Sequence, residues 1–253
     1  MTKPGPVRHV AHVMGMPVSL ALRGRHARDA AGARAWEGVT RWLEHVDTTF
    51  STYRPDSAVS RIDRGDLSIA DAPAEVREVL ALAERADRAT DGWFSVWLPG
   101  EGSRRRLDPS GLVKGWAVDR AAAHLAALDG TDYCLSAGGD LVCRTLDAAS
   151  EPWRIGIEDP HDRSRLVATV PVGTGAVATS GTAHRGQHLV DGRTGLAPDG
   201  VASVTVVTAS LTWADIDATA AYAQGPDAAR WLGTRPGRTG VVVWADGSTT
   251  LVG

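Results

Sequence analysis

The chain has 253 residues, of which 43% are hydrophobic and 23% charged, a composition typical of a soluble globular protein. It carries 27 Lys and Arg against 30 Asp and Glu, so its net charge of −3 provides no basic field for nucleic acid. No apolar run approaches the roughly 20 residues of a membrane span, and the first residues lack the apolar core of a signal peptide. We therefore expect a cytoplasmic protein with neither a nucleic-acid partner nor a membrane span.

The first half of the chain is predicted to hold a hairpin and two helices. Apolar and other residues alternate loosely over Val7–Leu22, which predicts a hairpin around Gly15. Apolar residues at helical spacing predict helices over Ala30–Phe50 and about Ala74–Thr90. Between these helices, the polar stretch Phe50–Asp63 contains a proline and predicts an irregular loop. Such a loop can hold a ligand or be a plain surface turn.

The second half is predicted to be mostly β, after a turn and a helix within Leu107–Gly130. Gly138-Gly139 is a hairpin dipeptide, and a short helix is predicted over Asp227–Leu232. The predicted strands are Tyr133–Ala137, Asp140–Thr145, Trp153–Glu158, Arg165–Val172, Ala202–Ala209, Gly240–Trp244 and about Thr249–Val252. This order of elements indicates an α+β fold: one compact domain over residues 1–253, with mixed or antiparallel sheets and packed helices.

The two cysteines, Cys134 and Cys143, lie on either side of the Gly-Gly turn. They could face each other across the hairpin, but we expect buried free thiols in strands. No Cys or His cluster has the spacing of a zinc site.

A dinucleotide fingerprint is matched by Gly173, Gly175 and Ala178, with Asp191 near the expected distance. That fingerprint requires a helix directly after the glycines, and the sequence that follows has no helical period. We therefore reject a Rossmann site.

The stretch Leu211–Gly225 is predicted to open a helix after a strand. Thr212 and Asp215 have the Thr-x-x-Asp spacing of a capping box. Asp215 and Thr219 are four residues apart, so their oxygens project from one helical face near the positive end of the helix. A carboxylate and a hydroxyl there suit a hard cation such as Mg²⁺, although a plain helix cap explains the same spacing.

A Pro/Ser/Gly turn at Leu107–Gly111 precedes the Ala-rich helix. Such a turn leaves backbone carbonyls and amides free near a helix start, an arrangement that serves phosphate and cation sites. Lys114 stands beside it, either as a point charge for phosphate or as a solvated lysine of the first helical turn.

Five sequence blocks, taken together and in order, resemble the FAD:protein FMN transferases, the ApbE family. Each block alone is weak, whereas the ordered set spans nearly the whole chain. The blocks are FSTYRPDSAVSRID (50–63), LDPSGLVKGWAVDR (107–120), LSAGGDL (135–141), ATSGTAHRGQHLVDGRTG (178–195) and WADIDATA (213–220).

The resemblance implies an ApbE-like fold and a Mg²⁺ held by Asp215 and Thr219, with a backbone carbonyl near Gly111. It also implies cleavage of the FAD pyrophosphate, transfer of FMN to a threonine or serine hydroxyl of a target protein, and release of AMP. Asp215 and His188 are then the expected catalytic residues. His188 would act as base or phosphate partner, although a histidine that caps a local turn is the alternative.

The same resemblance implies a set of residues that bind FAD. An aromatic ring lies against the flavin, glycines let the backbone approach it, and a Thr-Ser-Gly segment lines the nucleotide pocket. The last residue of the K-G-x-A-x-D motif belongs to this set, with a structural ion pair as its alternative. The implied FAD-binding residues are Tyr53, Ser110, Lys114, Asp119, Gly138, Gly139, Thr179, Ser180, Gly181 and His188.

Three features depart from the family pattern. Ser95 and Trp97 replace an expected Asp and Thr, Ser136 replaces an expected Asn, and the connection to Leu107 is shorter by several tens of residues. The shortened segment could reshape the FAD pocket or the groove for the target. Two alternatives therefore stay open: an FAD pyrophosphatase that yields FMN and AMP, and a non-catalytic FAD-binding or storage protein.

Overall fold

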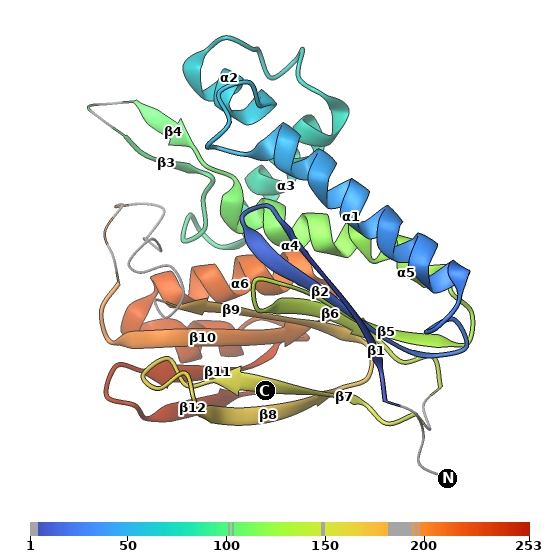
Figure 1. Cartoon of the computed structure of the whole chain (residues 1–253). Coiled ribbons are helices and arrows are strands. Elements are labelled where there is room, and N and C mark those ends of the chain that lie inside the picture. The colour runs from blue at the N-terminus through green and yellow to red at the C-terminus, as the bar shows by residue number, and fades with distance from the viewer. Residues whose placement is uncertain are drawn as a thin grey trace.

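Figure 1 shows the computed structural model, which describes residues 5–100, 102, 104–147, 150–181, 194, 196 and 198–253. Its centre is an eight-stranded sheet in the order β1-β2-β5-β6-β9-β10-β11-β12, with every pairing antiparallel. These strands are β1 (Val7–Val13), β2 (Met16–Gly24), β5 (Thr131–Ala137), β6 (Asp140–Arg144), β9 (Gly175–Gly181), β10 (Val201–Thr208), β11 (Thr239–Trp244) and β12 (Thr249–Val252).

Helices cover one face of this sheet, as the α+β prediction requires. The helices are α1 (Ala30–Phe50), α2 (Ala58–Arg64), α3 (Ala74–Ala89), α4 (Ser110–Ala121), α5 (Ala123–Ala126), α6 (Leu211–Ala223), the 3₁₀ turn η1 (Gly225–Asp227) and α7 (Ala228–Gly233). α4 and α6 contact each other; α6 packs on β6, β9 and β10, and α4 on β5 and β6. α1 packs on the outer side of α4 (Figure 1). Among the described residues, none of the helices is both long and apolar enough to cross a membrane.

A two-stranded sheet, β7 (Trp153–Glu158) and β8 (Leu166–Val172), lies against the opposite face of the large sheet. Trp153 packs there in a small core with Leu141, and Ile157 packs with Val243. Because helices cover one face and this hairpin the other, six consecutive residues of β10 are buried. Burial on both faces explains why Val201, Ala202, Val204 and Val206 do not alternate with exposed residues; the polar Ser203 and Thr205 are buried among them.

Several predicted elements are confirmed. The helix over Ala30–Phe50 has the predicted bounds, and Asp29 caps it by accepting hydrogen bonds from the amides of Ala31 and Gly32. The Gly138-Gly139 hairpin is present. Both cysteines are free thiols in strands, and they face each other in register across β5 and β6. Cys143 is buried as expected, whereas Cys134 is only half-buried.

Three predictions are wrong or incomplete. The loop over Phe50–Asp63 contains α2, whose N-cap is Ser57. The unassigned segment after Trp93 forms a hairpin of β3 (Trp97–Pro99) and β4 (Arg105–Leu107). Thr212 does not form a capping box with Asp215, because the N-cap of α6 is Ser210, whose hydroxyl accepts from the amide of Trp213.

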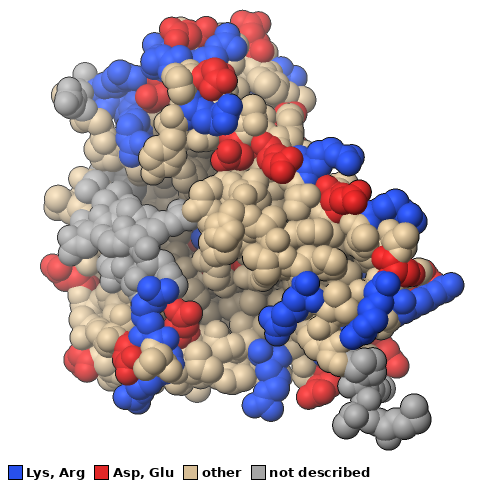
Figure 2. Space-filling model, in the orientation of Figure 1, with Lys and Arg blue, Asp and Glu red and all other residues tan. Residues whose placement is uncertain are grey.

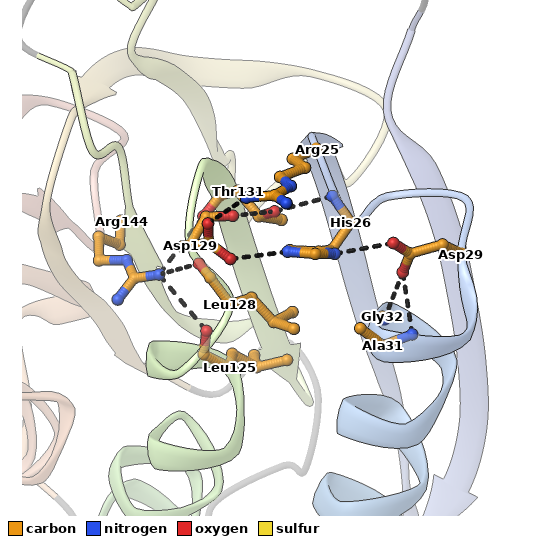
Figure 3. Close-up of polar contacts among 10 residues, drawn as sticks. All are labelled: Arg25, His26, Asp29, Ala31, Gly32, Leu125, Leu128, Asp129, Thr131 and Arg144. Carbon is orange, nitrogen blue, oxygen red and sulfur yellow. Dashed lines mark hydrogen bonds and ion pairs between the residues drawn. The ribbon is translucent and has the colours of Figure 1, made fainter.

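A histidine between two carboxylates fastens α1 to the neighbouring end of the sheet (Figure 3). The His26 ring nitrogens lie 2.8 Å from Asp29 on the one side and 2.8 Å from Asp129, in the α5–β5 loop, on the other. Its backbone amide donates to the Thr131 hydroxyl. The hydrogen bonds with Asp29 and Asp129 raise the pKa of His26, and the hydrogen bonds from His26 lower the pKa of both carboxyls.

Replacing His26 by Gln should remove a pH-dependent part of the folding stability. A pKa raised on folding adds stability below the unfolded value of about 6.5, which is lost as the pH rises through the folded value. The lowered pKa values of Asp29 and Asp129 add folding stability above about pH 4, and this stability is lost as the pH falls through the folded values. The difference in Tm between the parent protein and His26→Gln should therefore be largest near pH 5–6 and shrink by pH 9. A difference that stays constant over this range would contradict the account.

Candidate active site

The close approach of α4 to the start of α6 builds the site. Gly115 makes this approach possible, because a Cβ at its position would lie 2.8 Å from the carbonyl oxygen of Leu211 and 3.0 Å from the Cα of Thr212. Any larger side chain would push the helices apart. Asp119, one turn after Gly115, is thereby placed against the start of α6.

Asp119, one turn after Gly115, caps α6 from a distant part of the sequence. Its carboxylate accepts hydrogen bonds from the amides of Leu211 (2.9 Å) and Thr212 (2.8 Å). It also accepts from the hydroxyls of Ser210 (2.8 Å) and Thr212 (2.7 Å). These bonds satisfy amides that a helix start leaves unpaired, and they place a negative charge at its positive end. Both oxygens of Asp119 thus accept hydrogen bonds inside the fold, as a helix cap rather than as the ion pair of the structural alternative. Binding of FAD by Asp119 stays a prediction.

Lys114 lies between two buried carboxylates. Its Nζ is 2.5 Å from Oδ2 of Asp140 and 3.6 Å from Oδ1 of Asp215. Asp140 is only 1% exposed and Asp215 only 2%. Lys114 is therefore not the solvated lysine of the structural alternative. Buried charges of this kind are tolerated in proteins when they are paired.

One carboxylate oxygen of Asp215 lacks a hydrogen-bond partner among the described residues. This atom, Oδ2, is buried. Burial raises the pKa of the Asp215 carboxyl above its ordinary range, and the positive charge of Lys114 opposes that rise. A buried carboxylate oxygen without a partner is costly, so it marks a position where a ligand would be stabilised.

Hydroxyl groups complete this side of the site. Thr219 lies one turn after Asp215 on α6, and its Oγ1 is 3.0 Å from Oγ of Ser180 on β9. The neighbouring Thr179 donates its amide to Oδ1 of Asp140 at 2.9 Å, and its hydroxyl is 2.9 Å from that of Thr205. The Thr-Ser-Gly segment therefore contacts the buried carboxylate of Asp140 and, through Ser180, the predicted metal ligand Thr219 on α6.

The donor atoms around Asp215 fit Mg²⁺, because they are carboxylate and hydroxyl oxygens. Three or more His, Cys, Asp or Glu residues arranged to hold a metal occur nowhere in the residues described, so a zinc-type centre does not arise there. Gly111 lies in the first turn of α4, and its carbonyl stays a predicted third ligand.

The other predicted residues that the structure describes lie in loops and at the ends of helices and strands. Tyr53 is 95% exposed, which leaves its ring available to a ligand. Gly138 and Gly139 form an exposed turn with φ of +59° and +97°, directly before buried Asp140. Gly181 ends β9 and Ser110 begins α4. His188 lies outside the described residues. Figure 2 shows a hollow on this face, below the part that carries α2 and the β3–β4 hairpin.

Comparison with known proteins decides the family. The model of the ApbE family matches residues 14–99 and 96–243, which is most of the sequence. The chain belongs to the ApbE family. The two matched stretches meet within the β3–β4 hairpin, where the sequence predicts a connection shorter than the family pattern.

Relatives with assigned names agree with this membership. A protein of Vibrio cholerae named FAD:protein FMN transferase is 28% identical over 75% of this chain and 73% of its own length. A protein of the same name from Haemophilus influenzae is 24% identical over 79% of this chain and 75% of its own.

Solved structures show that the fold is shared. The ApbE protein of Thermotoga maritima superposes with a TM-score of 0.83 at 20% identity, covering 98% of this chain and 97% of its own. The flavinyl transferase ApbE of Pseudomonas stutzeri, in its apo form, gives 0.81 at 23% identity, covering 100% and 96%. The α+β prediction of an ApbE-like fold is confirmed.

The residue that the sequence prediction missed is Asp140. It lies inside the L-S-A-G-G-D-L block, in which only the two glycines were predicted to bind FAD. A carboxylate that opens a buried strand was the available signal, because such a group needs a partner. Its partner in this ApbE-family chain is Lys114, from the motif that also supplies Gly115 and Asp119.

Replacing Gly115 by Ala should destabilise the protein by about 1–3 kcal/mol, despite the higher helix propensity of Ala, because the added Cβ meets the backbone of α6. Gly111→Ala is the matched control on the same helix. Its Cβ would meet only Phe94 at 3.5 Å, an ordinary contact, so we expect no loss and a gain of up to about 0.5 kcal/mol. Urea unfolding measures both, and equal effects of the two variants would contradict the close approach.

Proposed function

We propose that this chain is a Mg²⁺-dependent FAD:protein FMN transferase. It cleaves FAD, attaches FMN to a threonine or serine hydroxyl of a target protein, and releases AMP. Membership of the ApbE family and the names of its relatives support the reaction class. The single observation that carries the proposal is the buried Asp215 carboxylate, whose Oδ2 is unpaired among the described residues, beside Thr219 and Lys114.

Asp215 and Thr219, with the carbonyl of Gly111, would hold the Mg²⁺. When bound there, the ion would neutralise negative charge that builds on the pyrophosphate during its cleavage. The protein's own contribution is to hold these oxygens on two helices whose separation Gly115 and Asp119 fix. Such fixed positioning lowers the cost of reorganisation when charge develops.

The transfer joins the oxygen of the acceptor hydroxyl to the phosphorus of the FMN half. The bond from that phosphorus to the bridging oxygen breaks, and this oxygen leaves with AMP. The acceptor proton passes to a base, a role that we assign to His188. Tyr53 would lie against the isoalloxazine ring, and the backbone of the exposed Gly138-Gly139 turn would approach the cofactor.

The test is to incubate the purified protein with FAD and Mg²⁺, with and without a protein that contains a candidate acceptor threonine. Chromatography and mass spectrometry follow AMP and covalently bound FMN. We expect AMP together with a flavinylated acceptor. AMP with free FMN, regardless of acceptor, would instead indicate the pyrophosphatase, and tight FAD binding without AMP the storage protein.

Asp215→Asn should lower the rate of AMP release by about 100-fold or more, because it removes the charge that attracts Mg²⁺. It should not lower the Tm of the Mg²⁺-free protein, because burial already disfavours the charged carboxylate. The matched control is Asp217→Asn on the same helix, where the fully buried Asp217 pairs with Arg235 and Arg238. That variant should lose stability yet keep its dependence on Mg²⁺. Unchanged AMP release by Asp215→Asn would contradict the metal assignment.

A further inference from the structure

The contacts of Lys114 are unequal. Its ammonium group is 2.5 Å from Asp140 and 3.6 Å from Asp215, so it is held chiefly by Asp140. All three groups are shielded from water, with side-chain exposures of 17% for Lys114, 2% for Asp140 and 3% for Asp215. Charges in such surroundings act strongly on one another and are weakly screened by salt.

Asp140 is fixed more firmly than Lys114. It is the first residue of β6, and its second oxygen, Oδ1, accepts a hydrogen bond from the amide of Thr179 on the neighbouring strand β9. Lys114, by contrast, ends a long side chain with several rotatable bonds. Of the two carboxylates that the described residues place beside Lys114, Asp140 is therefore the one that fixes the position of the ammonium group.

A divalent cation on Asp215 would meet the ammonium group of Lys114 at close range and be repelled by it. The strength of that repulsion depends on how far Asp140 holds Lys114 away. Without the charge of Asp140, Lys114 would have Asp215 as the remaining anionic partner among those that the structure places beside it.

We propose that Lys114 and Asp140 are positioning residues that set the cation affinity of the Asp215 site. Lys114 acts as an internal counter-cation that competes with the metal for Asp215, and Asp140 holds Lys114 aside so that the metal can bind. This inference rests on the metal site of the proposed function and adds to it the groups that control its occupancy.

A different role for Asp140 makes a different prediction. If Asp140 were itself a ligand of the cation, its loss would weaken binding whether or not Lys114 is present. If it acts through Lys114, its loss should matter only while Lys114 is there. A double-mutant cycle on these two residues separates the two cases.

The experiment titrates Mn²⁺, as a probe for Mg²⁺, into the whole 253-residue chain without FAD and follows free Mn²⁺ by electron paramagnetic resonance. Four proteins are compared: the parent, Asp140→Asn, Lys114→Met and the double variant. If each carboxylate is counted as −1 and the ammonium group as +1, the formal charge of these three side chains is −1, 0, −2 and −1, respectively. Asp140→Asn keeps the shape of the side chain and an oxygen that can accept from Thr179.

Asp140→Asn should raise the Kd for Mn²⁺ by about tenfold or more, and Lys114→Met should lower it by a similar factor. The double variant should bind within about threefold of the parent. A tenfold change in Kd corresponds to about 1.4 kcal/mol, well within the interaction of two unit charges at these distances. A purely structural role would weaken binding in all three variants.

Circular dichroism first establishes that each variant is folded. If Lys114→Met does not fold, Asp140→Asn and the double variant still test the proposal. The proposal requires the double variant to bind Mn²⁺ more tightly than Asp140→Asn does. Overturning results are a Kd unchanged by Asp140→Asn, or a double variant as weak as Asp140→Asn.

Asp215→Asn separates failure of this inference from failure of the proposed function. If the parent binds Mn²⁺ and Asp215→Asn does not, the metal site stands, and a wrong order among the other variants overturns the roles of Lys114 and Asp140 alone. If Asp215→Asn binds like the parent, or the parent binds no Mn²⁺, both proposals fail.

Discussion

The contact between α4 and the start of α6 is the constraint on which the site depends. Gly115 lets the two backbones approach, and Asp119 binds the free amides at the N-terminus of α6. The same helix α4 then carries Lys114 to the buried carboxylates of Asp215 and Asp140. One short motif of α4 thus performs three physical tasks: it sets a helix distance, caps a helix, and supplies a counter-charge.

This arrangement concentrates unfavourable electrostatics where a ligand can relieve it. Asp140 and Asp215 are almost completely buried, and among the described residues they share one ammonium group, that of Lys114. Removing one partner of a buried ion pair typically costs about 3–5 kcal/mol, because the other charge is then uncompensated. Binding of a cation beside buried carboxylates would lower their electrostatic free energy. Proteins commonly give up folding stability to keep such a site available to a ligand.

Much of the fold could be predicted from local patterns. The helix over Ala30–Phe50 and the Gly138-Gly139 hairpin follow from apolar spacing and turn chemistry within a few residues. The short helix α2 was missed because its seven residues are too few to show a helical period, and its signal, the Ser57 cap, resembles any polar turn.

Only part of the site could be predicted from the sequence, because some of its contacts are tertiary. Asp215 and Thr219 share a helical face, which their spacing alone predicts. The role of Asp119 as a cap for α6 and the pairing of Lys114 with Asp140 arise from tertiary contacts between segments far apart in the chain. No local pattern encodes such contacts, so the capping box assigned to Thr212 was wrong and Asp140 was overlooked.

The central claim is that Asp215 and Thr219 bind a divalent cation while Asp140 retains Lys114. The most direct measurement is anomalous diffraction from crystals of the protein soaked in Mn²⁺. The account predicts an anomalous peak in contact with the Asp215 carboxylate and the Thr219 hydroxyl, with Nζ of Lys114 still bound to Asp140. An anomalous peak confined to surface carboxylates at saturating Mn²⁺, with Lys114 unchanged between Asp140 and Asp215, would contradict it.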